Sequence, residues 1–117
     1  MNKKKLNSIL IDSFKSIDFA IKKLDSTALG IVLVINKNKK LIGTITDGDI
    51  RRAILKNIKF DEAIKKIMNL DPISVIENVS KSHMLKIIKK NNILHLPVLD
   101  SRGKVVNLET LHSLLGR

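Results

Sequence analysis

The sequence predicts an α+β protein built from two copies of a β-α-β-β-α unit related by a pseudo-two-fold axis. Two observations lead to this fold class. Short runs of β-branched residues alternate with segments of helical periodicity along all 117 residues. Shifting the chain by 64 residues, without a gap, places the second half on the first. Because two copies are too few for a repeat array, a symmetric pair is the expected arrangement.

The offset of 64 pairs polar as well as apolar positions, and Thr46 for example falls on Thr110. We therefore expect a first repeat over residues 1–68, which includes an N-terminal segment and a linker helix. The second repeat is expected over residues 69–117.

The first half of repeat one is expected to contain two strands and a helix. A short apolar stretch predicts a strand at 8–11. Helical spacing of apolar residues predicts a helix from Ser16, the N-cap, to Thr27. A continuous β-branched run predicts a strand at 31–35 that is covered on both faces, and a polar turn follows at 36–39.

The second half of repeat one is expected to form a strand at 41–46 and a tight turn at Asp47-Gly48. Helical segments are then predicted at 49–55 and 61–68.

Repeat two follows the same order after a break at Asp71-Pro72. Its last helix is expected to be cut short at Arg117, so that the module would belong to a longer protein. The predicted strands are 73–76, 94–99 and 105–109, and the predicted helices are 80–91 and 110–115.

Composition narrows the possible classes of protein. The chain lacks an apolar run near 18 residues, so its sequence predicts no membrane-spanning helix. It has no cysteine, which excludes disulfides and thiolate metal sites and favours a cytoplasmic protein. Its three histidines have no metal-site spacing, and no nucleophile or phosphate loop is evident, so we expect no metal and no enzyme activity in these residues.

The formal net charge of +11 attracts polyanions, and nucleic acid is one candidate. The lysines are nevertheless spread along the chain, and aromatic residues make up only 3% of it. Since single strands bind by stacking on aromatic side chains, nucleic-acid binding is the weaker interpretation.

The junction between the strand at 41–46 and the following helix could hold an anion. Backbone N–H groups at a helix N-terminus bind phosphate, and the Thr46 hydroxyl, Arg51 and Arg52 could add donors. The Asp49 carboxylate could accept hydrogen bonds from a ribose. The same Thr-x-x-Asp spacing is also that of a capping box, which needs no ligand.

Both halves of the chain resemble the CBS (cystathionine-β-synthase) domain pair, or Bateman module. The family signature is Gly, two or three apolar or small residues, Thr or Ser, two residues, then Asp or Asn, and it stands at residues 43–49 as Gly-Thr-Ile-Thr-Asp-Gly-Asp. A companion signature, Pro-Val-x-Asp before a glycine turn, stands at 97–100. The resemblance covers essentially the whole chain and implies a tandem pair of CBS repeats.

The resemblance implies a regulatory module that binds an adenine nucleotide such as AMP, ADP or ATP between the repeats, without a required cofactor. Asp49 would hold the ribose and Thr46 the phosphate. The other ligand-binding residues implied are Asp47, Gly48, Arg51 and Arg52 on the phosphate side, and Pro72, Ile73, Ile93 and Leu94 around the base.

The second repeat departs from the signature. Asn107 stands at the glycine position and Ser113 at the aspartate position. Serine offers one hydroxyl where two carboxylate oxygens are wanted. We therefore expect one competent nucleotide site per chain and a degenerate second one.

The family resemblance also implies a homodimer formed by CBS pairs. Residues 43–55 look closest to CBS pairs joined to sugar-1-phosphate nucleotidyltransferases, which would make such an enzyme the covalent or associated partner. Two alternatives from other classes stay open: a ligand-free structural dimerisation module, and a basic nucleic-acid-binding domain.

Overall fold

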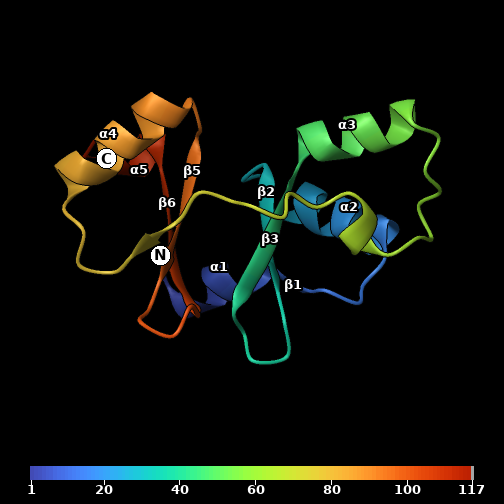
Figure 1. The fold of residues 1–117 in the computed structure, drawn as a ribbon, viewed down its shortest axis with the longest axis horizontal. Helices are drawn as coiled ribbons and strands as arrows, with labels where there is room; N and C mark the ends of the chain where they lie inside the picture. The colour runs from blue at the N-terminus through green and yellow to red at the C-terminus, as the bar shows by residue number, and fades with distance from the viewer. Residues whose placement is uncertain (117) are drawn as a thin grey trace.

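The computed structural model describes residues 1–116 and contains two three-stranded sheets that stand side by side (Figure 1). The first sheet has the order β1-β2-β3 and the second the order β4-β5-β6. In each sheet the first two strands are parallel and the last two antiparallel. The tandem α+β pair predicted from the 64-residue offset is therefore confirmed. Arg117, where the last helix was expected to be cut short, lies outside the described residues.

The first repeat begins with a helix that the sequence did not predict. The segment at 3–8 is helical, and the strand expected at 8–11 starts two residues later than predicted. The 3-10 helix is shorter than the helix expected at 61–68, because Ala63 is extended and forms an isolated bridge with Ser16. The elements are α1 (Lys3–Ser8), β1 (Leu10–Asp12), α2 (Ile17–Thr27), β2 (Ile31–Ile35), β3 (Leu41–Thr46), α3 (Asp47–Leu55) and η1 (Ile64–Lys66).

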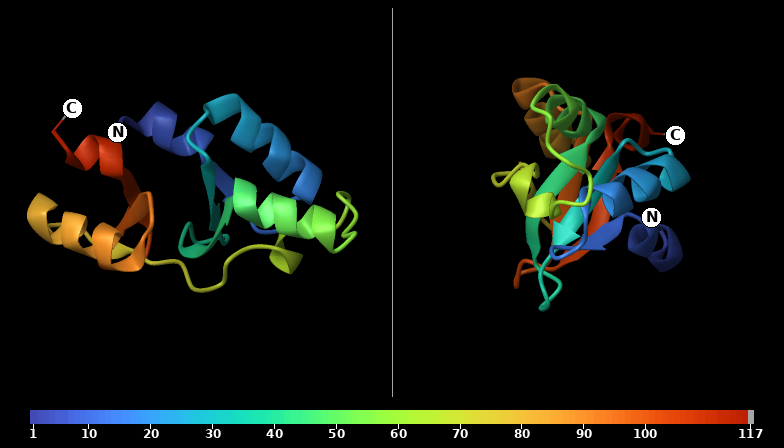
Figure 2. Two further views of the ribbon diagram at one scale, coloured as in Figure 1. Left: turned by 90° about the horizontal axis from the view of Figure 1, so that it is seen from above. Right: turned by 90° about the vertical axis from the view of Figure 1, so that its right-hand side faces the viewer.

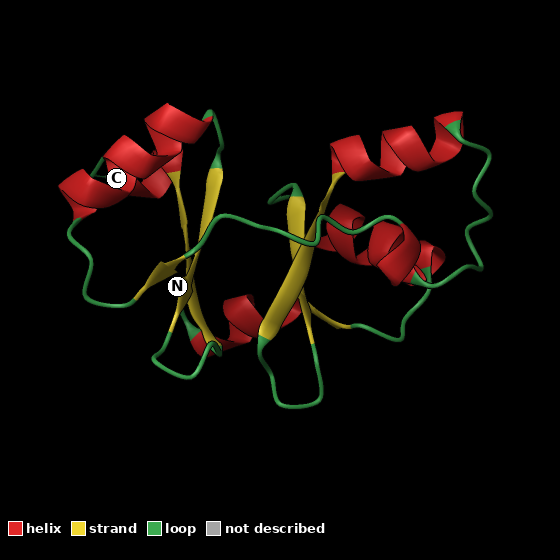
Figure 3. Cartoon of the chain, in the orientation of Figure 1, coloured by secondary structure: helices red, strands yellow, loops and turns green. Residues whose placement is uncertain are grey.

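The second repeat repeats this order with a shorter first strand than the predicted 73–76. Only Val75 and Ile76 pair with the central strand of the sheet. The elements are β4 (Val75–Ile76), α4 (Lys81–Asn91), β5 (His95–Leu99), β6 (Val105–Thr110) and α5 (Leu111–Leu114). Figure 3 shows that α3, α4 and α5 lie at one end of the two sheets, while both hairpin turns lie at the other.

Local sequence accounts for the element boundaries. Ser16 and Ser80, which are equivalent by the offset, each accept a backbone hydrogen bond from the third residue onward, as N-caps do. All five residues of β2 are buried, as expected for a strand covered on both faces.

None of the helices among the described residues is long and apolar enough to span a bilayer.

Helix α1 and the linker between the repeats lie on opposite sides of the pair (Figure 2). The linker passes over β3, where Asn69 forms an isolated bridge with Thr44. On the other side, α1 packs against β6 of the second repeat. Its Leu6 is only 7% exposed and joins a buried cluster that includes Leu33 and Leu108. Each repeat thus supplies a segment that crosses toward its neighbour.

Candidate functional site

A pocket of about 180 Å³ opens between the two repeats, on the linker side. It is smaller than the roughly 300–1,000 Å³ of typical small-molecule sites, so a large ligand would extend beyond it. We call it the inter-repeat cleft. Its lining residues come from β2 and β3, the linker and β5, and they are Ile31, Thr44, Thr46, Asn69, Asp71, Pro72, Ile73, Ile93, His95 and Pro97.

Strand β3 contributes two hydroxyl groups to the cleft because alternate residues of a strand face the same side. Thr44 is buried, and Thr46 is half-buried at the point where the strand ends. The linker closes over them, since Thr44 N donates to Asn69 O at 3.2 Å and Asn69 N donates to Thr44 O at 2.9 Å. These bonds fix one wall of the cleft.

Gly43 permits this close approach. A methyl group added to its Cα would lie 2.8 Å from Met68 Sδ and 2.9 Å from the backbone oxygen of Asn69. The signature glycine is therefore needed so that the linker can pack against β3.

His95 ties the opposite wall of the cleft to the first repeat. Its Nε2 lies 2.6 Å from the backbone oxygen of Leu29, which belongs to the turn before β2. A carbonyl oxygen only accepts hydrogen bonds, so Nε2 carries the proton and donates. In the neutral ring, Nδ1 is then left as an acceptor.

The carboxylate of Asp49 is already engaged by its own helix. Its Oδ2 accepts from Thr46 N at 2.9 Å and from Thr46 Oγ1 at 3.2 Å, and its Oδ1 pairs with Arg52 Nη2 at 2.8 Å. The Asp49 side chain is only 13% exposed. The capping interpretation of the Thr-x-x-Asp spacing is therefore confirmed. Helix α3 begins at Asp47, so the turn expected at Asp47-Gly48 is instead the first turn of this helix.

The predicted ligand residues do not all lie in one place. Thr46, Pro72, Ile73 and Ile93 line the inter-repeat cleft. Asp47 lines a separate hollow with Gly30 and Ile50. Asp49 and Arg52 line a third hollow, together with Lys56 and Met68. Gly48 is half-buried in the first turn of α3, while Arg51 is exposed and Leu94 is 62% exposed.

Several residues of the cleft were absent from the sequence prediction. Thr44 could have been found, because it lies two residues before Thr46 in a predicted strand. Asn69 and Asp71 carried no such signal, since their position depends on how the linker crosses β3. His95 lies in the strand predicted at 94–99, and the structure shows it hydrogen-bonded at the cleft.

The pseudo-two-fold mate of the inter-repeat cleft is filled with apolar side chains. The offset of 64 converts Thr44 into Leu108, Ile73 into Ile9 and Pro97 into Leu33. All three apolar residues belong to one buried cluster, which Leu6 of α1 completes. Leu70, the equivalent of Leu6, is instead 72% exposed. The two faces of the pair therefore differ in shape as well as in sequence.

Helix α5, the equivalent of α3 in the second repeat, is capped without a carboxylate at the signature position. Thr110 N donates to Ser113 Oγ at 2.8 Å, and Ser113 Oγ donates to Glu109 Oε1 at 2.8 Å.

Within residues 1–116, no group of three or more histidine or acidic side chains is placed to hold a metal ion.

Comparison with protein families gives one match, which covers both repeats. The family model described as "CBS domain" matches residues 1–56 and 64–115. An uncharacterised protein of Helicobacter pylori is 32% identical over 111 residues, which are 93% of this chain and 33% of that protein. The arabinose 5-phosphate isomerase KdsD of Pseudomonas aeruginosa is 31% identical over 101 residues, 86% of this chain and 31% of the isomerase. The chain thus spans about a third of either relative.

Solved structures share the fold over almost the whole chain. A CBS domain protein from Pyrobaculum aerophilum, complexed with AMP, has a TM-score of 0.84 at 19% identity and covers 93% of this chain and 84% of that one. The CBS domain pair of protein MJ0100, in complex with 5'-methylthioadenosine and S-adenosyl-L-methionine, has a TM-score of 0.81 at 29% identity, covering 92% and 84%.

Proposed function

This chain belongs to the CBS-domain family, and on that premise we propose that it is a regulatory module that binds one adenine nucleotide between its two repeats. The observation that carries the proposal is the composition of the inter-repeat cleft. Apolar walls from Ile31, Ile73 and Ile93 suit a purine base, and the hydroxyls of Thr44 and Thr46 suit a ribose or a phosphate. Relatives with adenine-containing ligands support the same ligand class.

We propose that Asp49 changes partners when the nucleotide binds. Thr46 lines the cleft and hydrogen-bonds directly to Asp49, so a ribose that enters beside Thr46 comes within reach of this carboxylate. Arg52, which now pairs with Asp49, would then be free to meet the phosphate. The same helix start would serve as a cap without ligand and as part of a site with ligand.

A single nucleotide per chain follows from the filled mate position. Leu108 stands where a threonine hydroxyl would be needed, and Leu6 occupies the space. Ser113 cannot supply a carboxylate. We therefore expect a binding stoichiometry of one.

Regulation would come from the contacts that a nucleotide makes with both repeats. The cleft takes its walls from β3 and the linker on one side and from β5 on the other. A ligand that favours one arrangement of these walls shifts the equilibrium between two states of the pair. We expect residues 1–68 and 69–117 to act as the two moving units.

The proposal also covers the oligomeric state of this module, its location in the cell and its partner enzyme. We infer a homodimer, which is supported by the exposed apolar residues Ile54, Leu55 and Leu115 on the helical side. A cytoplasmic location is supported by the absence of cysteine from the sequence. The likeness of residues 43–55 supports a sugar-1-phosphate nucleotidyltransferase as the attached or associated enzyme, and the isomerase relative makes sugar phosphates the broader substrate class to test.

Isothermal titration calorimetry of the whole chain with AMP, ADP and ATP tests the function. We expect one site per chain for at least one of the three, and weaker binding in Thr46→Val, which removes the hydroxyl at similar volume. Two equivalent sites would refute the single-site proposal. If none of the three nucleotides binds and light scattering shows a dimer, a ligand-free dimerisation module would instead be favoured.

A further inference from the structure

The turns of the two hairpins lie at the same end of the molecule, away from α3, α4 and α5 (Figure 1). They are joined directly, because Lys40 and Lys104 form an isolated antiparallel bridge and Leu41 N donates to Gly103 O at 3.1 Å. Since Lys40 and Lys104 are equivalent by the offset of 64, the pseudo-two-fold relation places the two turns side by side. The turns therefore form one surface.

The backbone of each turn is held by one side chain at the same position. In the first turn, Asn36 Oδ1 accepts from Asn38 N at 2.9 Å and from Lys40 N at 3.0 Å. In the second, Asp100 Oδ1 accepts from Arg102 N at 2.8 Å and from Lys104 N at 3.0 Å. These bonds fix the turns through backbone N–H groups of Lys40, Arg102 and Lys104, and they do not involve the charged ends of these side chains.

A hollow of about 680 Å³ lies between the two turns, and we call it the basic cradle. Five of its seven lining residues carry a positive charge, and none is acidic or aromatic. None of the five takes part in the three ion pairs found among residues 1–116. The lining residues are Lys37, Asn38, Lys39, Lys40, Ser101, Arg102 and Lys104.

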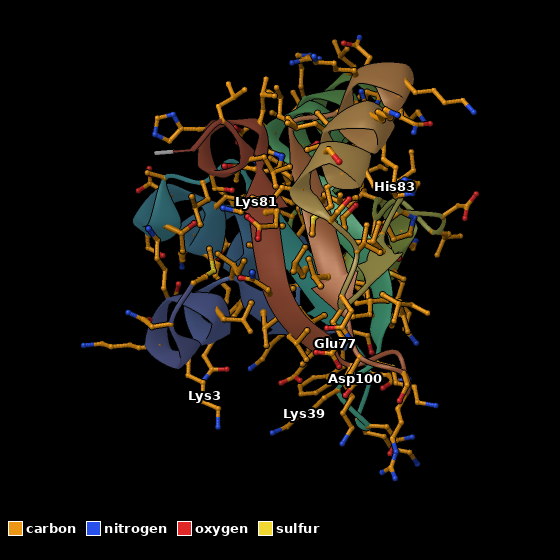
Figure 4. The ribbon with its side chains drawn as sticks, turned by 90° about the vertical axis from the view of Figure 1, so that its left-hand side faces the viewer. Lys3, Lys39, Glu77, Lys81, His83 and Asp100 are labelled. Atoms are coloured by element: carbon orange, nitrogen blue, oxygen red, sulfur yellow. The ribbon has the colours of Figure 1, made fainter. Side chains whose placement is uncertain are left out.

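Two carboxylates, Glu77 and Asp100, are labelled at the same end of the molecule as Lys39 in Figure 4. Asp100 is committed to its turn: the N–H groups of Lys104 and then Arg102 hold the pKa of this carboxyl below 3.8. Glu77 follows β4 and donates its backbone N–H to Leu99. These two charges leave the cations of the cradle in excess.

Lys39 occupies a backbone conformation that favours glycine. Its φ is +62°, and the equivalent residue of the second repeat is Gly103, with a φ of +85°. A lysine at this position adds a charge to the basic cradle where glycine would be less strained. Such outliers are often retained for function.

We propose that the basic cradle is a binding site for an oligophosphate, meaning a chain of two or more linked phosphate groups, either free or as the tail of a nucleotide. Five cations in one hollow match several phosphate charges close together. A nucleic-acid strand would favour a stripe of cations with aromatic side chains for stacking, and the cradle offers neither. The cradle shares no lining residue with the inter-repeat cleft, so the proposal does not depend on nucleotide binding there.

Calorimetry of the whole chain with inorganic triphosphate at low salt tests this site. The cradle variant combines Lys39→Gly, Lys40→Gln and Arg102→Gln. We expect it to bind triphosphate on the order of tenfold more weakly than the wild type, given the modest worth of each exposed charge pair. Because Lys39→Gly relieves the turn, the loss cannot be attributed to a strained backbone.

A control variant removes the same charge from helix α4, through Lys86→Gln, Lys89→Gln and Lys90→Gln, all of which are exposed. It should bind triphosphate like the wild type. Equal weakening in both variants, or no binding by the wild type, would overturn the proposal. Binding of a single-stranded oligonucleotide but not of triphosphate, lost in the cradle variant, would overturn it in favour of a nucleic-acid site.

Two further ligands distinguish the sources of the oligophosphate. Tighter binding of ATP than of triphosphate, reduced in the cradle variant but not in Thr46→Val, identifies a nucleotide tail. Equal binding of ATP and triphosphate identifies the phosphate chain alone.

Discussion

His95 of the second repeat donates a hydrogen bond to the backbone oxygen of Leu29 in the first, over an Nε2 to O distance of 2.6 Å. The two residues are not equivalent by the internal offset: Leu29 corresponds to Ile93, and His95 to Ile31. The bond therefore exists on one side of the pseudo-two-fold axis only. It lies at the inter-repeat cleft, and it couples the wall formed by β5 to the turn before β2.

Replacing His95 with phenylalanine should destabilise the pair. The ring volume is largely kept, but the half-buried Leu29 oxygen loses its donor, which costs about 1–2 kcal/mol in the free energy of unfolding. Urea denaturation measures this change. His83→Phe on α4 is the control, since His83 is exposed and its substitution should stay within about 0.5 kcal/mol. Equal effects of the two variants would mean that the bond to Leu29 contributes nothing.

Asp49→Ser should remove nucleotide binding while it preserves the helix cap. Ser113 shows that a serine at this position accepts a hydrogen bond from the N-cap backbone, at 2.8 Å. The variant should therefore unfold within about 1 kcal/mol of the wild type, as expected when one capping group replaces another. Its thermal shift with AMP should disappear. A full AMP shift in Asp49→Ser would show that the carboxylate does not hold the ribose.

The reverse substitution, Ser113→Asp, tests the filled mate position. It restores the signature aspartate in the second repeat but leaves Leu6 and Leu108 in place. We expect the stoichiometry with AMP to stay at one. A second binding event in calorimetry would contradict our interpretation that the apolar cluster excludes a ligand.

Most of the fold could be predicted from local patterns, because strands such as β2 and helices such as α2 and α4 carry their own periodicity and caps. Helix α1 could not. Within the stretch Lys3–Ser8 only Leu6 is buried, so no amphipathic period is visible. The helix is stabilised by the contact of Leu6 with the cluster around Leu33 and Leu108, and these partners lie far away in the sequence.

The candidate site was predicted in part for a similar reason. The helix start at Thr46 was visible in the sequence, including its cap to Asp49. The cleft itself depends on a linker that crosses β3 through Asn69, and no local pattern encodes that crossing. The 64-residue offset predicted that the second site is degenerate, whereas the apolar side chains that fill it became evident only in three dimensions.

The two glycines of the signature should respond oppositely to alanine. In Gly43→Ala, the new methyl group would collide with the backbone oxygen of Asn69, 2.9 Å away, so the linker must move. We expect a loss of about 1–3 kcal/mol in the free energy of unfolding and weaker binding of AMP. In Gly48→Ala, the nearest atom is the flexible end of Arg52, at 3.3 Å. Because alanine favours helix, that variant should unfold within about 1 kcal/mol of the wild type or be more stable.

The same urea titrations distinguish the two cases. Tolerance of alanine at position 43, or a loss at position 48 as large as that at 43, would show that the contact between β3 and the linker is not tight.

Asp100 should make the stability of the second turn depend on acid pH. The backbone N–H groups of Lys104 and Arg102 lower the pKa of this carboxyl from 3.8 in the folded chain. A folded pKa below the unfolded one means that the stabilisation is complete above pH 3.8 and is lost as the pH falls through the folded pKa. Asparagine holds the equivalent turn at position 36 without titrating, so Asp100→Asn should keep the turn and lose this pH dependence.

Urea denaturation of both proteins between neutral pH and pH 2.5 measures the effect. The unfolding free energy of the wild type should fall toward that of Asp100→Asn as the pH drops below 3.8, and the difference between them should be constant at higher pH. The converse variant, Asn36→Asp, places a carboxylate in front of the same two kinds of donor in the first turn and should acquire this acid dependence. Parallel curves for wild type and Asp100→Asn over the whole range would mean that the bonds from Lys104 and Arg102 do not distinguish the charged carboxylate from a neutral acceptor.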